Sequence, residues 1–138
     1  MNRGDFQKIA EERLKDAEVL LQKKRYSGAY YLCGYVLECA LKACIAKQTK
    51  EHDFPPERKV IEMVYTHNLS TLVKSAGIEK IFEDSRKKDK ELEKNWSVVV
   101  GWQEISRYEK HDPKKARDIF RAITDNKHGV LQWVKQRW

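Results

Sequence analysis

The amino-acid sequence predicts an all-α protein, an antiparallel bundle of four to five helices in which residues 1–138 form a single domain. Three observations predict this fold. The chain has only six glycines and three prolines, so few positions interrupt a helix. Apolar residues recur at three- and four-residue spacing along most of the chain. Hydrophobic residues make up 41% and charged residues 36%, which is typical of a folded, charge-rich protein rather than a disordered one.

The first two helices are predicted at 6–23 and 28–47, with Asp5 and Ser27 as their N-caps. The short polar break between them makes the two helices antiparallel neighbours. The apolar side of the first helix is formed by Phe6, Ile9, Ala10, Leu14, Ala17, Leu20 and Leu21.

The second helix contains an apolar stretch, 28–46, whose nineteen residues include only two charges, Glu38 and Lys42. Its length is close to that of a membrane span, but two central charges are costly in lipid. We therefore expect the central helix of a bundle. The two charges stand four residues apart with the glutamate first, which favours a pair on one helix face. Either the pair is exposed on a narrow wet face, or it lines a pocket or meets a charge from another helix. Gly34, one turn before Glu38, would allow another segment to approach the backbone closely.

The middle of the chain begins with a predicted loop at 49–59, because Pro55 and Pro56 forbid helix continuation. A short helix follows, capped by Thr66 or Asn68 and ended by Gly77.

The segment 83–94 alternates in charge sign, as an exposed helix or a mobile loop does. The next segment, 92–108, is predicted to be a helix that reaches the core through Leu92, Trp96, Val99 and Ile105, with a possible break at Gly101. A last long helix is predicted from Asp112 as cap and Pro113 at the first helical position to the end of the chain.

The formal net charge of +7 is unevenly distributed. Residues 113–138 contain seven basic and two acidic side chains, which gives +5 for this segment. A basic segment attracts phosphate backbones at long range. The alternative is a solvated helix face without a ligand.

Neither the cysteines nor the histidines indicate a metal site or a disulfide framework. Cys33, Cys39 and Cys44 all fall in the second predicted helix, and an odd number there predicts buried thiols and a cytoplasmic location. Residues 1–12 contain no apolar core of a secretory signal. The four histidines lack metal-ligand spacing, and no cofactor is expected. Three of the four tryptophans are expected in the core or at a dimer seam, and Trp138 to be exposed.

Several short motifs, taken in order, resemble HEPN domains (higher eukaryotes and prokaryotes nucleotide-binding). They are "ERLKDAEVLL", "YSGAYYLCGYVLECALKACIA", "THNLSTLV" and "W…SRYE". The matching positions are Arg13, Asp16, Ala17, Glu38, Leu41, Lys42, His67, Leu69, Arg107 and Tyr108.

The resemblance implies a bundle of four or five helices that commonly forms a homodimer. It also implies binding of RNA or a nucleotide, often in a prokaryotic toxin–antitoxin or defence module beside a nucleotidyltransferase partner. Ribonuclease members carry an arginine and, after four to six residues, a histidine, which together cut RNA without metal. Here only three residues separate Arg107 from His111, and Tyr108 replaces the usual polar residue. The sequence is therefore more similar to a subgroup without the nuclease motif.

Three functions follow as hypotheses. In the first, the protein binds RNA or a nucleotide in a polar groove near Glu38, Lys42, Arg107 and Tyr108. In the second, it is a metal-independent endoribonuclease that uses Arg107 as phosphorane stabiliser and His111 as base. In the third, it is a non-catalytic interaction subunit. We further expect Glu38 to be paired with a cation from another helix, with Arg107 as the predicted partner.

Overall fold

In the computed structural model, which describes residues 1–48, 62 and 64–138, the regular elements are all helical, as predicted, and the described residues contain no strand. The predicted loop at 49–59 lies outside the described residues. The elements are α1 (Arg3–Gln22), α2 (Tyr26–Gln48), α4 (Leu69–Ser75), α5 (Glu79–Lys88), α6 (Lys90–Val99), the 3₁₀ helix η1 (Glu104–Tyr108), α7 (Pro113–Thr124) and α8 (Val130–Lys135).

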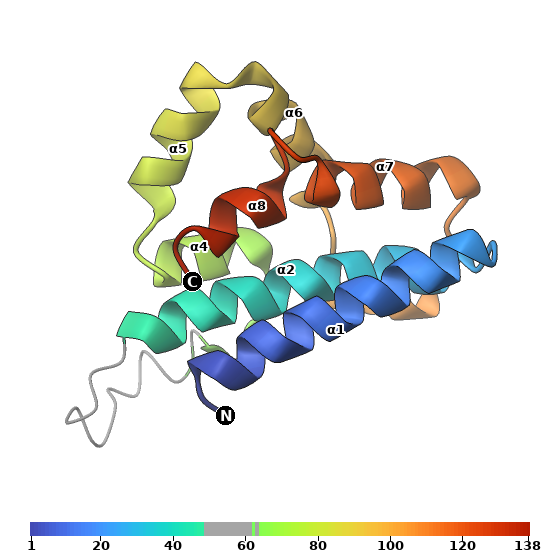
Figure 1. Cartoon of the computed structure of the whole chain (residues 1–138), viewed down its shortest axis with the longest axis horizontal. Coiled ribbons are helices and arrows are strands. Elements are labelled where there is room, and N and C mark those ends of the chain that lie inside the picture. The colour runs from blue at the N-terminus through green and yellow to red at the C-terminus, as the bar shows by residue number, and fades with distance from the viewer. Residues whose placement is uncertain (49–61, 63) are drawn as a thin grey trace.

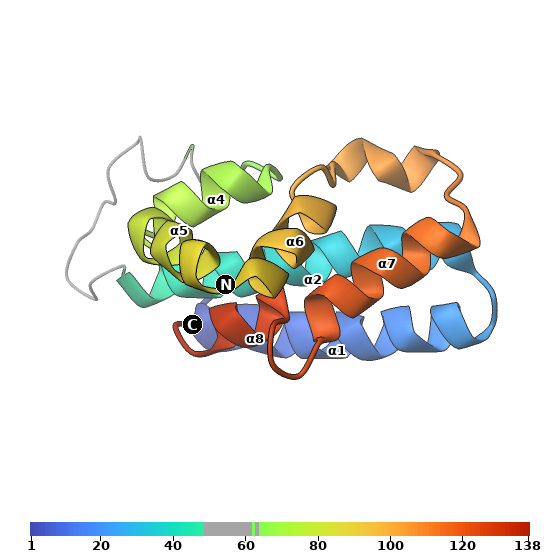
Figure 2. The same ribbon diagram turned by 90° about the horizontal axis from the view of Figure 1, so that it is seen from above.

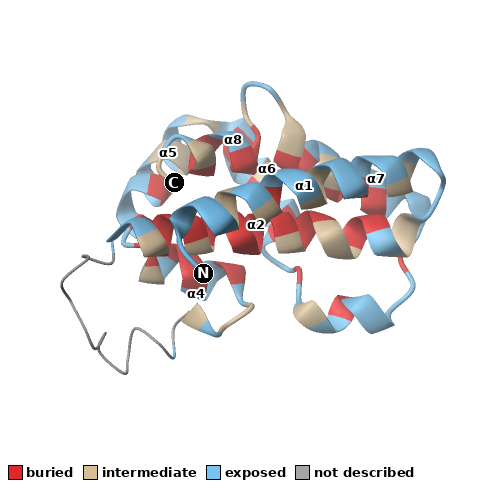
Figure 3. Ribbon diagram, turned by 60° about the horizontal axis from the view of Figure 1, so that its bottom comes forward, coloured by how far each residue is buried: buried red, intermediate tan, exposed pale blue. Residues whose placement is uncertain are grey.

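Helix α2 is the centre of the fold. It contacts α1, α4, η1, α7 and α8, and α1 runs beside it along most of its length (Figures 1 and 2). By length and composition alone α2 could cross a membrane, but 72% of its apolar window is buried inside the protein. In Figure 3 this helix is largely red, the colour of buried residues. A helix that is apolar on most sides and enclosed by its neighbours is the core helix of a folded domain.

The first two helices form the predicted antiparallel pair, but their caps differ from the prediction. Asn2, not Asp5, is the N-cap of α1. The Asn2 side chain accepts from the Asp5 N–H, and Asp5 accepts from the Asn2 N–H, which forms a capping box. Helix α2 begins at Tyr26, so Ser27 lies inside its first turn rather than before it.

Helices α4, α5 and α6 lie where the sequence predicted helical segments, and the predicted helix at 92–108 is broken around Gly101 into α6 and η1. Asn68 caps α4 through a bond from the Thr71 N–H. Gly77 ends the turn after α4 with φ +70°, a conformation that favours glycine. The charge-alternating segment forms most of α5 and the start of α6, divided at Asp89, whose carboxylate caps α6. Ile105 is exposed, so its predicted place in the core was wrong.

The final predicted helix is in fact two. Asp112 and Pro113 start α7 as predicted, but α7 ends at Thr124. The Asp125 carboxylate then accepts from the backbone N–H groups of Lys127 and His128, which forms a local turn. Gly129 begins α8, and a Cβ there would lie 2.4 Å from the Asp125 carbonyl oxygen, so the tight turn requires glycine.

The close approach predicted at Gly34 is made by Trp102. A Cβ at Gly34 would lie 2.1 Å from the Trp102 ring, so the indole packs directly on the backbone of α2. Tyr31 lies against the same indole, with ring centroids 5.9 Å apart. Trp96, Trp102 and Trp133 are all buried, as expected for three of the four tryptophans, whereas Trp138 packs half-buried against the core rather than being exposed. Because only Gln103 separates Trp102 from η1 in the chain, this contact fixes η1 beside α2.

Candidate functional site

A series of ionic contacts begins at the centre of α2. Lys42 donates from Nζ to Glu38 Oε1 over 2.8 Å, the predicted pair on one face of the helix. The same Glu38 oxygen lies 2.9 Å from Nδ1 of His67. His67 directly precedes Asn68, the cap of α4, so the start of α4 places this imidazole against α2.

The contacts continue from His67 to η1. His67 Nε2 lies 3.3 Å from Glu104 Oε2, and Glu104 Oε1 lies 3.2 Å from Nη1 of Arg107. Glu38 and Arg107 are therefore joined through His67 and Glu104. The prediction of a direct Glu38–Arg107 pair was wrong, since a histidine provides the contact from outside α2. The two ring nitrogens of His67 thus face carboxylates from two different segments.

This series of side chains runs from the core to the surface. The side chain of Glu38 is 2% exposed, that of Lys42 is 12% exposed, and that of His67 is 43% exposed. The alternative of a fully exposed Glu38–Lys42 pair was therefore wrong. One carboxylate oxygen of Glu38, Oε2, is buried without a hydrogen-bond partner. A buried acceptor without a donor has lost its hydrogen bonds to water and gained none in return, which destabilises the folded state.

Arg107 and Tyr108 form the exposed end of these contacts. The Arg107 guanidinium carbon lies 4.7 Å from the centroid of the Tyr108 ring, and Tyr108 is 74% exposed. The neighbouring Tyr108 and then Glu104 raise the pKa of Arg107, which keeps its positive charge. An open tyrosine ring can stack on a nucleobase, and a guanidinium can bind phosphate.

His111, the predicted partner of Arg107 in catalysis, has different surroundings. Its imidazole stacks on Tyr30 with ring centroids 3.9 Å apart. Its Nε2 lies 3.3 Å from the Ser106 carbonyl oxygen, and its backbone N–H donates to Ser27 Oγ. The His111 side chain is only 3% exposed. Arg107 and His111 thus contact separate groups, and the imidazole is enclosed by protein.

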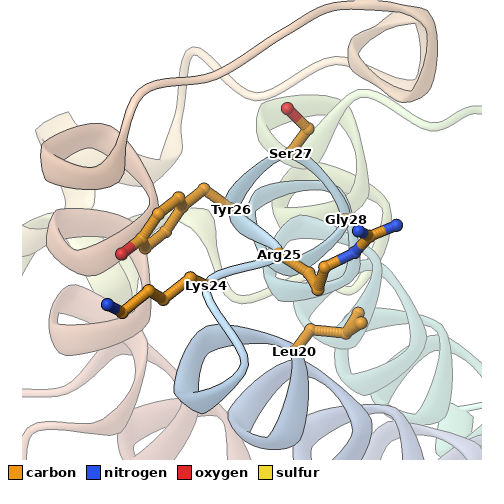
Figure 4. Close-up of a pocket in the computed structure, with 6 residues that line it drawn as sticks. All are labelled: Leu20, Lys24, Arg25, Tyr26, Ser27 and Gly28. Carbon is orange, nitrogen blue, oxygen red and sulfur yellow. The ribbon is translucent and has the colours of Figure 1, made fainter.

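A second polar feature lies at the turn between α1 and α2, where an open pocket of about 400 Å³ is lined by Leu20, Lys24, Arg25, Tyr26, Ser27 and Gly28. Figure 4 shows Tyr26 and Lys24 extending to one side of the turn and Arg25 to the other. The ring of Tyr26 lies under the guanidinium of Arg117 from α7, 5.7 Å from the centroid. The sequence analysis did not identify this pocket.

The three cysteines are free and buried, as predicted. Burial raises the pKa of Cys33 to about 12 and those of Cys39 and Cys44 to about 11, so the thiols are poor nucleophiles. Among the described residues, no group of three or more His, Cys, Asp or Glu side chains could hold a metal ion.

Sequence reasoning found the ends of the ionic series and named His67 among the positions that match the family, but it missed Glu104 and the contacts of His67 with the two glutamates. No local pattern marks either residue. Their roles depend on Trp102, which holds η1 beside α2, and on the approach of α4.

Comparison with protein families identifies the HEPN domain. The model of the HEPN domain matches residues 5–137, nearly the whole chain. Neither the curated proteins nor the solved structures contain a significant match.

Proposed function

The chain belongs to the HEPN domain family, and we propose that it binds RNA or a nucleotide through Arg107 and Tyr108. The observation that carries this proposal is the exposed arginine–tyrosine pair, which the ionic contacts with Glu104 and His67 connect to buried Glu38. Glu38 and Lys42, the other two predicted ligand-binding residues, are 2% and 12% exposed, so they support the site from inside the protein rather than line a groove.

The chemistry of the pair suits a single-stranded nucleic acid or a nucleotide. Stacking of one base on an aromatic side chain contributes about 1–3 kcal/mol and requires no particular base. Arg107 lies beside the ring and can contact the adjoining phosphate. Glu104 contacts one edge of the guanidinium and restricts Arg107 before a ligand binds. Arg107 therefore loses less side-chain entropy on binding.

The test is a titration of labelled single-stranded RNA and of ATP against the protein at two salt concentrations. Tyr108→Ala is expected to weaken binding about tenfold, the equivalent of about 1.4 kcal/mol of stacking. Trp138→Ala is the matched control, because Lys135 lies over that ring at 5.2 Å and the C-terminus is at the other end of the molecule from the α1–α2 turn (Figure 1). The proposal fails if neither RNA nor ATP binds at low salt.

The wider role follows from the family, which is associated with ribonuclease toxins and nucleotidyltransferase partners. We propose a homodimer in a cytoplasmic toxin–antitoxin or defence module, with a nucleotidyltransferase as partner protein. Val98, Val100 and Ile105 are exposed apolar residues that precede and follow Trp102 in the chain. Exposed apolar side chains of this kind are suited to a dimer interface. Light scattering tests the dimer, and co-purification with the product of a neighbouring nucleotidyltransferase gene tests the partner.

The alternative, an endoribonuclease that uses Arg107 and His111, has less geometric support. A general base must reach the 2′-hydroxyl, and the His111 imidazole is enclosed between Tyr30 and the Ser106 carbonyl. Incubation of the same RNA in EDTA with wild type and His111→Ala separates the two functions. Binding without cleavage is expected for both proteins.

A further inference from the structure

We propose that Lys24, Lys115 and Arg117, here called the turn–α7 basic cluster, form a second contact surface for the phosphodiester backbone of RNA. The ligand would then be an RNA strand of several nucleotides rather than a single nucleotide. This inference rests on the proposed function, because it extends the ligand that Arg107 and Tyr108 would hold.

The cluster is assembled from two elements that are far apart in sequence. Lys24 lines the open pocket at the α1–α2 turn. Arg117, on α7, lies over the Tyr26 ring of that pocket, and Lys115 Nζ lies 5.1 Å from the centroid of the Tyr30 ring. In Figure 4 the side chains of Lys24 and Tyr26 extend to the same side of the turn. Two aromatic rings thus hold the cations of α7 beside the turn.

The cluster side chains form no salt bridge with a carboxylate. The ion pairs of the described residues include none of its three members. The adjacent Lys114, in contrast, is paired with Asp118 over 2.7 Å, and Lys114 and, at longer range, Arg117 lower the pKa of Asp118. All three cluster residues are exposed. Three cations without a salt bridge, on neighbouring elements, form an electrostatic surface for phosphate groups.

The backbone at Lys24 provides a separate reason to assign a role to the turn. Lys24 has φ 58°, the left-handed region, directly after the C-cap residue of α1. Glycine is the usual residue there, and a side chain costs about 1–2 kcal/mol. A lysine at this position places a cation at the edge of the pocket despite that cost. Strain of this kind is often found at functional sites.

The cluster and the Arg107–Tyr108 pair lie at the same end of the molecule. The backbone N–H of His111, in the segment between η1 and α7, donates to Ser27 Oγ at the α1–α2 turn over 2.9 Å. Figure 2 shows η1, the start of α7 and the α1–α2 turn together at that end, opposite α5. A strand that stacks a base on Tyr108 could therefore continue across the cluster.

The test compares two double variants with equal loss of charge. Lys24→Gln/Arg117→Gln removes two cations of the cluster. Lys80→Gln/Lys88→Gln is the control, because both lysines are exposed on α5 at the opposite end. Binding of a labelled oligouridylate and of ATP is measured at several salt concentrations, and thermal melting checks that each variant is folded.

Loss of two single-strand phosphate contacts should reduce the slope of log K against log salt by about 1.4. Between about 50 and 200 mM salt, wild type should then lose about sevenfold more oligouridylate affinity than the cluster variant loses. ATP binding and the control variant should match wild type. An unchanged slope, or an equal change in the control, overturns the second surface but leaves binding at Tyr108 intact. Absence of oligouridylate binding by wild type overturns both proposals.

Discussion

Removal of the Glu38 carboxylate should destabilise the fold strongly, because it leaves a cation without its partner near the core. Glu38 accepts from Lys42 and contacts His67, and its own side chain is 2% exposed. Breaking a buried ion pair by removing one member costs about 3–5 kcal/mol. Two features place Glu38→Ala at the lower end of that range. His67 is nearly half exposed and can be hydrated, and the unsatisfied Oε2 atom is removed together with the carboxylate.

We therefore expect Glu38→Ala to lower the free energy of unfolding by about 3 kcal/mol. For a domain of this size the loss corresponds to a fall in Tm of about 10 °C. Urea unfolding at pH 7, followed by circular dichroism, measures the change. A decrease in the free energy of unfolding of less than about 1 kcal/mol is typical of a solvent-exposed ion pair. That result would refute the burial of this glutamate.

Replacing both members of the Glu38–Lys42 pair by apolar residues separates the effect of charge on stability from the effect of side-chain packing. Glu38→Leu/Lys42→Met removes both charges of the pair, so neither is left buried without its partner. The double variant should therefore be more stable than Glu38→Ala. The coupling energy in a double-mutant cycle should be at least about 2 kcal/mol. Strictly additive losses would show that Glu38 and Lys42 do not interact.

Three further predictions concern packing, pH and thiol reactivity. Gly34→Ala should lower the free energy of unfolding by at least about 2 kcal/mol and change the tryptophan fluorescence, because the new Cβ would overlap the Trp102 ring. Asp89 lies 2.7 Å from His128 and raises its pKa, while His128 lowers the pKa of Asp89. The stabilisation from this pair should be complete between the ordinary pKa of an aspartate, about 3.9, and the ordinary pKa of a histidine, about 6.5, and should be lost as the pH rises through the raised pKa of His128. Unfolding measured from pH 5 to 9 for wild type and His128→Asn should therefore converge at high pH. Cys33 should resist alkylation in the native protein at pH 8 and react once urea unfolds it, which mass spectrometry detects.

Each of these predictions has a matched comparison. Gly101→Ala is the control for Gly34→Ala, because a Cβ at Gly101 would meet nothing within 4 Å. The stability of Gly101→Ala should match that of wild type. A constant difference between wild type and His128→Asn from pH 5 to 9 would contradict the ion pair. Alkylation of Cys33 at equal rates with and without urea would contradict its burial.

The fold was predictable because its main signals are local. The long apolar run of α2, the Asn68 cap and the Asp112–Pro113 start each depend on a few neighbouring residues. Asn2 was missed as a cap because Asp5, its reciprocal partner in the capping box, is an equally good capping residue. The break between α7 and α8 was missed because the apolar period continues across it, although Asp125 and Gly129 form a tight turn.

The candidate site was only partly predictable, for a physical reason. The Glu38–Lys42 pair is a spacing within one helix, and the sequence displays it directly. The contacts of Glu38 with His67, and of His67 with Glu104, join three segments separated by 29 and 37 residues in the chain. Arg107 was predicted as the partner because it is the stronger fork-shaped donor. The packing of Trp102 on Gly34 instead brings Glu104 to His67 and leaves Arg107 at the surface.

Ultraviolet crosslinking of a bound oligouridylate, with mass spectrometry of the crosslinked peptides, tests most directly whether this protein binds RNA at η1. The exposed Tyr108 ring lies beside the Arg107 guanidinium and should be the main aromatic crosslink. Addition of unlabelled RNA should remove that crosslink, and high salt should weaken it. Crosslinks confined to Trp138 or to other residues away from η1, with none at Tyr108, would contradict the proposed function.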